Sequence, residues 1–308
     1  MSRRSFRLVV VLMLVAAGLA GCRSRSSASP APADVPAGKS EQSIQVGGLT
    51  RTFHIYRPHG LPSPAPLVVM LHGGFGSGTQ AEQYYGWDAE ADRNHFAVLY
   101  PDGRNHAWNV GGGCCGDPGR EGTDDVAFIT AMVQAVEAKV PIDANRVYAT
   151  GISNGGLMAY RLACDTDLFA AIGPDSATQL GACPAPKQLS VLHIHGTADT
   201  RIRYQGGEGD GAAHINGPPV PDVVAGWRTV DGCGTPTVSV AGSVTTSAAE
   251  CPSGRAVELI TIAGAGHQWP GSPSRPGREA VLGADPPSDA VNATEVFWRF
   301  FAAHARSR

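Results

Sequence analysis

Short, uninterrupted apolar runs recur along this chain, and they constrain its fold more than any other feature of the sequence. Residues 67–71 form a run of five between Pro66 and Gly73, which is typical of a strand buried on both faces of a sheet. The sequence predicts further strands of this kind at residues 97–100, 146–150, 191–194 and 258–262.

Helical patterns lie between these predicted strands. Valine or isoleucine recurs at a helical spacing over residues 126–136, and an apolar stripe covers residues 296–301. Strands that alternate with helices predict parallel βαβ units, and hence a doubly wound, mostly parallel α/β sheet with helices on both faces. Two segments depart from this alternation. Residues 43–57 predict an opening hairpin, and the Gly- and Pro-rich residues 200–256 predict an inserted excursion.

Composition and charge exclude several classes of protein. Of the 308 residues, 43% are hydrophobic and 17% are charged, which excludes whole-chain disorder and a polytopic membrane protein. The first 40 residues hold six basic residues and one acidic residue, so the whole-chain net charge of −3 leaves −8 for residues 41–308. An acidic domain predicts no nucleic-acid partner and no direct binding to an anionic membrane.

The N-terminus has the features of an export signal. Three arginines precede an apolar run at residues 8–20, which is too short to span a bilayer. Residues 1–21 are therefore a predicted signal peptide, of either the twin-arginine or the ordinary type. The run ends in Leu-Ala-Gly before Cys22, which resembles the bacterial lipobox. This resemblance predicts a lipid anchor on Cys22, with a plain cleavable signal as the alternative.

The sequence after the signal predicts a tether and then one catalytic domain. Residues 22–40 are rich in Ser, Ala and Pro, a composition that cannot pack and is typical of a flexible linker. Residues 41–308 form the predicted catalytic domain. We expect an exported protein, either anchored to the cell membrane by its lipid or extracellular, with no other membrane contact.

Six further cysteines suit this location, because an even number in an exported protein predicts disulfides. The expected pairs are Cys164–Cys183 and Cys233–Cys251, each of which joins the ends of one local segment. Cys114 and Cys115 then pair with each other or belong to a rearranged set.

A nucleophile motif occupies the turn after one predicted strand. Residues 151–155 read Gly-Ile-Ser-Asn-Gly, a match to G-x-S-x-G. A strand precedes the motif and helix-forming residues 156–162 follow it, which is the context that a nucleophile elbow requires. Ser153 is therefore the predicted nucleophile, and its hydroxyl needs a histidine base and an acid that orients the histidine.

Asp199 and His267 are the predicted acid and base. Each follows the end of an apolar strand, so both belong to loops at the same sheet edge as Ser153. The order Ser, Asp, His is that of the α/β-hydrolases. The competing acids are Asp175, Asp210 and Asp222. The first of these is the strongest rival, because it too follows an apolar segment.

A glycine-rich loop follows the first buried strand. Residues 72–76 read His-Gly-Gly-Phe-Gly, and the backbone N–H groups of such a loop can bind the oxyanion that forms during acyl transfer. The expected donors are the amide of Asn154 and that of Gly74 or Phe75. A phosphate-binding loop is the alternative, but the loop lacks the Lys-Ser or Lys-Thr pair of a P-loop.

The sequence predicts no metal and no cofactor. His193 and His195 share a strand face, but Thr197 stands where a zinc hydrolase pattern needs an acid, so two structural histidines are expected. Trp108 and Trp269 are predicted to line the substrate pocket, with a place in the core as the alternative.

Seven short motifs make the chain similar to a known family. They are His72-Gly73-Gly74, Tyr100-Pro101-Asp102-Gly103, Trp108-Asn109, Cys114-Cys115, residues 151–156, residues 195–199 and residues 266–271. Together they resemble the secreted polyhydroxybutyrate depolymerase and feruloyl esterase group of α/β-hydrolases, over nearly all of residues 43–303. The resemblance implies the α/β-hydrolase fold and hydrolysis of carboxylic esters through an acyl-serine intermediate, with Ser153, Asp199 and His267 as the triad.

The resemblance leaves the substrate open. Depolymerases that act on solid polyester often add a separate binding domain, whereas this chain ends at its last predicted helix. Hydroxybutyrate oligomers or polyester, and feruloyl or acetyl esters of polysaccharides, are the expected substrates. The rival functions are an acyltransferase of the same fold, which would depend on an acceptor alcohol, a serine peptidase, and a tethered binding lipoprotein without catalysis.

Overall fold

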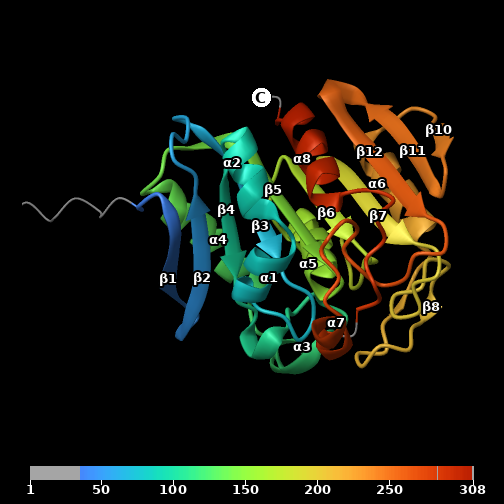
Figure 1. The fold of residues 1–308 in the computed structure, drawn as a ribbon, viewed down its shortest axis with the longest axis horizontal. Coiled ribbons are helices and arrows are strands. Elements are labelled where there is room, and N and C mark those ends of the chain that lie inside the picture. The colour runs from blue at the N-terminus through green and yellow to red at the C-terminus, as the bar shows by residue number, and fades with distance from the viewer. Residues whose placement is uncertain (1–34, 283, 307–308) are drawn as a thin grey trace, which may run out of the picture. The chain divides into compact units, whose positions relative to one another are not determined.

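The computed structural model describes residues 35–282 and 284–306, and within them ten strands form one sheet (Figure 1). These strands are β1 (Gly38–Val46), β2 (Leu49–Arg57), β3 (Ala65–Leu71), β4 (Ala97–Pro101), β5 (Ile142–Ile152), β6 (Ala171–Asp175), β7 (Ser190–Gly196), β10 (Thr237–Ala241), β11 (Val244–Cys251) and β12 (Arg255–Ile262). Two short strands, β8 (Gly207–Glu208) and β9 (Asn216–Gly217), pair separately. The α-helices are α1 (Gly78–Tyr84), α2 (Trp87–Asn94), α3 (Gly116–Glu121), α4 (Asp125–Glu137), α5 (Asn154–Asp165), α6 (Val220–Asp231), α7 (Pro276–Leu282) and α8 (Ala293–Ala303).

The centre of the sheet is parallel and both of its edges are antiparallel. The strand order is β1-β2-β4-β3-β5-β6-β7-β12-β11-β10, and every pair from β4 to β12 is parallel. The outer pairings, β1 with β2, β2 with β4, β12 with β11 and β11 with β10, are antiparallel. The predicted doubly wound, mostly parallel α/β sheet is confirmed.

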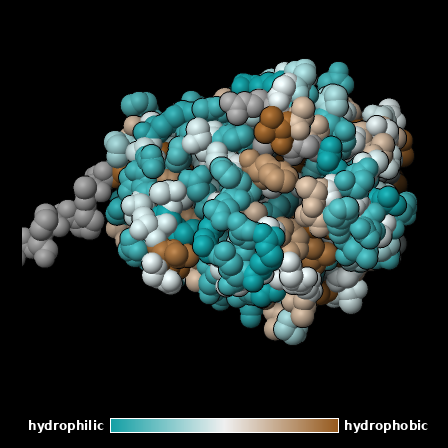
Figure 2. Space-filling model, turned by 90° about the horizontal axis from the view of Figure 1, so that it is seen from below, coloured by the Kyte–Doolittle hydropathy of each residue, from teal (hydrophilic) through white to brown (hydrophobic). Residues whose placement is uncertain are grey.

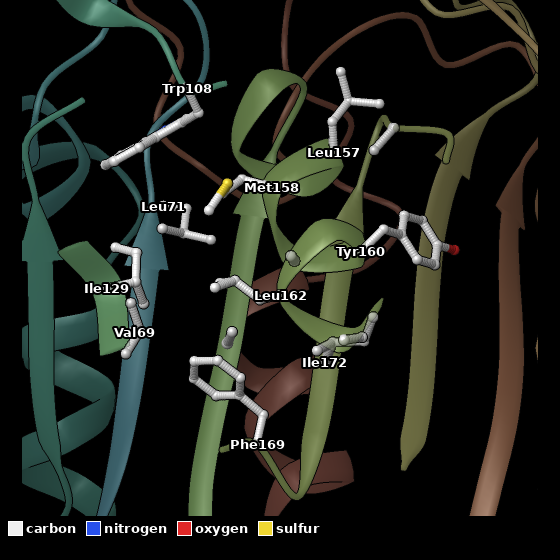
Figure 3. Packing of buried hydrophobic residues seen from close by; sticks show 14 of the residues in the cluster. Val69, Leu71, Trp108, Ile129, Leu157, Met158, Tyr160, Leu162, Phe169 and Ile172 are labelled. Carbon is white, nitrogen blue, oxygen red and sulfur yellow. The ribbon is translucent and has the colours of Figure 1, made fainter. Parts of the chain in front are cut away.

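Helices cover both faces of this sheet, and this explains why the run of apolar residues in strand β3 is uninterrupted. Successive side chains of a strand point to opposite faces, so a strand covered on both sides needs apolar residues at every position. Val69 and Leu71 belong to the core beneath α4, α5 and α6, which they share with Ile129 and Met158 (Figure 3). Met70, between them, belongs to the core beneath α1, α2 and α8.

The structure corrects two boundaries. Strand β1 begins at Gly38 and Val35 is buried, so the folded domain includes residues that the sequence assigned to the tether ending at residue 40. Pairing with β2 over nine residues explains this, because the partner strand and not local composition sets the length of β1. The rest of the predicted tether, the signal peptide and Cys22 lie outside the described residues.

The second correction concerns residues 200–256. Strands β10 and β11 continue the main sheet beside β12, and α6 packs on its face, so only the stretch before α6 departs from the α/β pattern. The antiparallel edge escaped the sequence analysis because β10 has no buried residue and β11 has only two, so neither strand carries an uninterrupted apolar run.

Three disulfides join Cys164 to Cys183, Cys233 to Cys251, and Cys114 to its neighbour Cys115. The first two pairs are those expected, and the third settles the alternative that the sequence left open. Over residues 35–282 and 284–306, none of the helices combines the length and the apolarity needed to cross a membrane.

Candidate active site

Ser153 occupies a sharp turn between β5 and α5. Its φ of 55° and ψ of −124° lie outside the regions that residues with side chains favour. The two motif glycines make room for the neighbouring strand. A Cβ atom on Gly151 would lie 2.6 Å from the carbonyl oxygen of Leu71, and one on Gly155 would meet the same oxygen even more closely. The G-x-S-x-G pattern is therefore required here by the close approach of β3.

Asp199 and His267 form a buried hydrogen-bonded pair. His267 Nδ1 donates to Asp199 Oδ2 at 2.8 Å, and Asp199 Oδ1 accepts the N–H groups of Arg201 and Ile202, both at 2.9 Å. Burial opposes the ionisation of Asp199. The nearby His267 and hydrogen bonds from His195 and His267 outweigh that effect and hold the pKa of Asp199 below its usual range.

The parallel sheet brings these residues to one edge. Strands β5, β6, β7 and β12 are successive parallel neighbours, so their C-terminal ends lie on the same side of the molecule (Figure 1). Ser153, Asp199 and His267 follow the ends of β5, β7 and β12 by one, three and five residues. Active sites of open α/β sheets form at this edge.

A cavity of about 510 Å³ opens at this edge, and both Ser153 and His267 line it. No hydrogen bond joins the hydroxyl of Ser153 to His267 within the described residues, and such contacts commonly tighten only when substrate binds. Figure 2 views the molecule from this side and shows apolar residues scattered through a mostly hydrophilic face. A second cavity of about 580 Å³, beside α6, contains neither residue.

Comparison with known proteins assigns the family. Residues 52–200 match a family model described as "Esterase PHB depolymerase". The chain is 30% identical to "Putative esterase NocK" of Nocardia uniformis subsp. tsuyamanensis, over 92% of this chain and 94% of that protein. The chain belongs to the PHB depolymerase esterase family. The family resemblance drawn from the seven sequence motifs is confirmed, and the protein is an ester hydrolase.

Two other proteins extend the comparison. The esterase is 31% identical to Feruloyl esterase B of Piromyces equi, over 66% of this chain and 39% of that protein. Among solved structures, the acetyl xylan esterase from Aspergillus awamori superposes with a TM-score of 0.57 at 18% identity, covering 79% of this chain and 99% of that one. The second likeness shows a shared α/β-hydrolase fold.

The glycine-rich loop of the esterase departs from expectation at Phe75. The amide of Phe75 already donates to the carbonyl oxygen of His106 at 2.9 Å. Gly74 lines the cavity with Ser153, and none of the backbone hydrogen bonds in the described loops and turns uses its amide. Asn154 opens α5, where the first N–H groups of a helix lack intrahelical partners. Of the expected donors, Phe75 is engaged, whereas the backbone hydrogen bonds of the described loops and turns use neither the amide of Asn154 nor that of Gly74.

Neither predicted pocket tryptophan is among the described residues that line the cavity. The buried indole N–H of Trp108 donates to the carbonyl oxygen of His72 at 2.9 Å, and that of Trp269 donates to Thr294 Oγ1 at 3.0 Å. Because each indole N–H finds an internal acceptor, both rings can be fully desolvated. Both lie in the core, the alternative that the sequence left open. Trp108 also fixes Asn154, whose side-chain amide is bonded to both the N–H and the C=O of Trp108.

Asp285 is a site residue that the sequence analysis missed. Its Oδ2 accepts the N–H of His267 at 2.7 Å, and its own N–H donates to the carbonyl oxygen of His267 at 2.7 Å. A Cβ atom on Gly266 would collide with this carboxylate, which explains the glycine before the histidine. No motif marks Asp285 itself, because it lies 18 residues from His267 in an irregular segment.

A buried hydrogen-bonded chain stands behind Asp199. Tyr160 Oη lies 2.7 Å from His193 Nδ1, His193 Nε2 lies 3.0 Å from His195 Nδ1, and His195 Nε2 lies 2.8 Å from the carbonyl oxygen of Ile202. Because a carbonyl only accepts, His195 Nε2 carries a hydrogen. His193 Nε2 then donates to His195 Nδ1, and the hydroxyl of Tyr160 donates to His193 Nδ1. Burial lowers the pKa of His193 well below its usual range, which favours its neutral form. His195 Nε2 is also 3.4 Å from Asp199 Oδ2, so this chain presents a donor to the predicted acid.

None of the three rival acids is hydrogen-bonded to His267 within the described residues. Asp175 ends β6, and neither of its buried carboxyl oxygens has a hydrogen-bond partner among the described residues. Burial raises the pKa of Asp175 well above its usual range, and the charge of Asp199 adds to the effect. Asp210 accepts a hydrogen bond from Thr200, and Asp222 lines the second cavity. In the described part of the chain, no cluster of three or more His, Cys, Asp or Glu residues is arranged to hold a metal ion.

Proposed function

We propose that the esterase hydrolyses carboxylic esters through an acyl-serine intermediate, with Ser153 as nucleophile, His267 as general base and Asp199 as the acid that orients the base. The observation that carries this proposal is the 2.8 Å hydrogen bond from His267 Nδ1 to Asp199 Oδ2, at a cavity that Ser153 also lines. With its Nδ1 hydrogen held by Asp199, His267 keeps Nε2 as an acceptor for the serine proton.

Acylation begins when Ser153 Oγ bonds to the ester carbonyl carbon and its proton passes to His267 Nε2. The carbonyl π electrons move onto the oxygen, and the amides of Asn154 and Gly74 bind the resulting oxyanion. When the carbonyl re-forms, the carbon–oxygen bond to the alcohol breaks. The alcohol oxygen takes the proton from His267 and leaves the acyl group on Ser153.

Deacylation repeats these steps with water. His267 Nε2 accepts a proton from a water molecule as the water oxygen bonds to the acyl carbon. The second tetrahedral intermediate collapses by breaking its bond to Ser153 Oγ, which recovers the proton from His267. Asp199 stays ionised throughout and stabilises the imidazolium that forms in each half-reaction.

The proposed substrates are hydroxybutyrate oligomers and feruloyl or acetyl esters. A cavity of about 510 Å³ falls within the range of small-molecule sites, about 300–1,000 Å³. The names of the family and of the two relatives above support these ester classes.

We also propose that the esterase is exported and anchored through Cys22. The three disulfides support export, because disulfides persist in oxidising compartments. Cys22→Ser should move the protein from the membrane fraction to the soluble secreted fraction without lowering its specific activity. Unchanged fractionation would show that Cys22 is not the anchor.

The test of the proposed reaction is Ser153→Ala, assayed with 4-nitrophenyl butyrate, methyl ferulate and hydroxybutyrate oligomers. We expect kcat to fall by about 10³-fold or more, with an unchanged circular dichroism spectrum. Residual activity above about 1% of wild type would rule out Ser153 as the nucleophile.

A further inference from the structure

Arg201 lies at the wall of the active-site cavity, and its side chain has no partner among the described residues. It lines the same cavity as Ser153 and His267. Its Nε–H is buried and has no acceptor, and its guanidinium forms no ion pair within the described residues. A buried donor on a charged group is costly to leave unpaired, so the geometry suits a site that a ligand completes.

The charge of the cavity wall points to the sign of that ligand. The described wall contains Arg120 and Arg201 but no Asp or Glu. Arg120 is largely exposed and forms an ion pair with Asp117, three residues before it on α3. Of the two arginines in the described wall, Arg201 is therefore the one whose charge is not paired.

The backbone around Arg201 is fixed, so the guanidinium extends from a rigid base. Its N–H donates to Asp199 Oδ1 at 2.9 Å, and Asp210 N–H donates to the carbonyl oxygen of Thr200 at 2.9 Å. The backbone of Gly211 packs against the side chain, since a Cβ atom there would lie 3.4 Å from Arg201 Cβ. The planar guanidinium that extends from this base matches the two oxygens of a carboxylate.

We propose that Arg201 binds a carboxylate carried by the substrate, so that the esterase prefers esters that bear a free carboxylate. This inference rests on the proposed function, because it takes the cavity lined by Ser153 as the substrate site. Oligomers of hydroxy acids belong to the preferred class, since each ends in a carboxylate on the alcohol side of its last ester bond. Feruloyl and acetyl esters of neutral sugars do not belong to it.

Two matched pairs of esters test the inference and distinguish the side on which the carboxylate sits. The acyl-side pair is monomethyl adipate and its primary amide, methyl adipamate. The alcohol-side pair is 3-acetoxybutanoate and 3-acetoxybutanamide. In each pair an amide replaces the carboxylate at nearly constant shape, and the measured quantity is the ratio of kcat/KM for the charged ester to that for the neutral ester.

We expect this ratio to exceed one in at least one pair for the wild type and to fall by about 10- to 100-fold in Arg201→Gln, the value of a charge-assisted hydrogen bond. Arg201→Lys keeps the charge but lacks the paired N–H donors of the planar guanidinium, so it should retain part of the preference for the charged ester. Arg203→Gln is the matched control, because Arg203 is exposed and is not part of the described cavity wall, and it should keep the wild-type ratio. An unchanged ratio in Arg201→Gln, or a loss found in Arg120→Gln in its place, would overturn the proposal.

Failure of this inference can be told apart from failure of the proposed function. Neutral-ester hydrolysis that depends on Ser153, together with a ratio of one in both pairs, would overturn only the role of Arg201. If no ester is hydrolysed, calorimetric titration of Ser153→Ala with 3-acetoxybutanoate and with monomethyl adipate still decides the question. The affinity for at least one of the two esters should fall about tenfold or more when Arg201→Gln is added to Ser153→Ala. If each ester binds the single and the double variant with the same affinity, carboxylate binding by Arg201 is refuted.

Discussion

Asp285 and His267 are bonded to each other in both directions. The N–H of His267 donates to the Asp285 carboxylate, and the N–H of Asp285 donates to the His267 carbonyl, each at 2.7 Å. Two hydrogen bonds thus close the loop between these residues at its base. The Asp285 carboxylate is thus hydrogen-bonded to the main chain of His267 and not to its imidazole ring. The position of the ring depends on this main-chain contact.

Replacing Asp285 by Ala should lower kcat by about 10- to 100-fold and change KM little, because a small displacement of His267 misaligns the proposed base. Asp285→Asn keeps one side-chain acceptor and should restore most of kcat, which a merely destabilised fold would not explain. Asp289→Ala, at an exposed position four residues on, is the control and should match the wild type. Wild-type kcat in Asp285→Ala would remove Asp285 from the site.

Asp199→Asn should leave His267 in place but favour the wrong tautomer, so kcat should fall by orders of magnitude with KM little changed. The corresponding substitution in serine proteases lowers kcat by about 10⁴-fold. Asp175→Asn is the control and should keep kcat within about threefold, because the hydrogen bond of His267 goes to Asp199. The reverse result would make Asp175 the acid while leaving the fold and the reaction class intact.

Asp175 should also make stability depend on pH. Burial raises the pKa of Asp175 in the folded state well above its unfolded value. Over the pH range between the two pKa values the native state binds the extra proton, so stability falls as pH rises, by about 1.4 kcal/mol per pH unit. Asp175→Asn removes this penalty. Its Tm should exceed that of the wild type at pH 8, and the difference should shrink toward pH 4. A difference that stays constant with pH would contradict a neutral Asp175.

Two buried tyrosines offer a matched test of the chain behind Asp199. Tyr160→Phe leaves His193 Nδ1 without its donor, which costs about 1–3 kcal/mol of unfolding free energy and should lower Tm by several degrees. The hydroxyl of Tyr148 is buried with no partner among the described residues, so Tyr148→Phe should be neutral or stabilising. Thermal unfolding followed by circular dichroism measures both. Equal effects would indicate that the Tyr160 hydroxyl adds nothing to the fold.

Local patterns were sufficient to predict much of this fold and site. The position of Ser153 was predicted because the elbow is a local strand–turn–helix pattern, and the positions of Asp199 and His267 because each follows a recognisable strand. What was missed depends on contacts between distant segments. The amide of Phe75 is engaged by the carbonyl of His106, which lies 31 residues further along the chain, and Asp285 reaches His267 from an irregular segment. Neither contact has a periodic signal in the sequence.

The stretch between Asp199 and α6 is pinned at its start by the carboxylate of Asp199, and it contributes no strand to the main sheet. It nonetheless supplies Arg201, Ile202 and Ile215 to the cavity wall. A related enzyme can therefore change its substrate specificity by altering this one stretch, while the residues in the positions of Ser153, Asp199 and His267 stay where they are. Enzymes with identical motifs should then be sorted by the residue that stands where Arg201 does, and not by the motifs that they share.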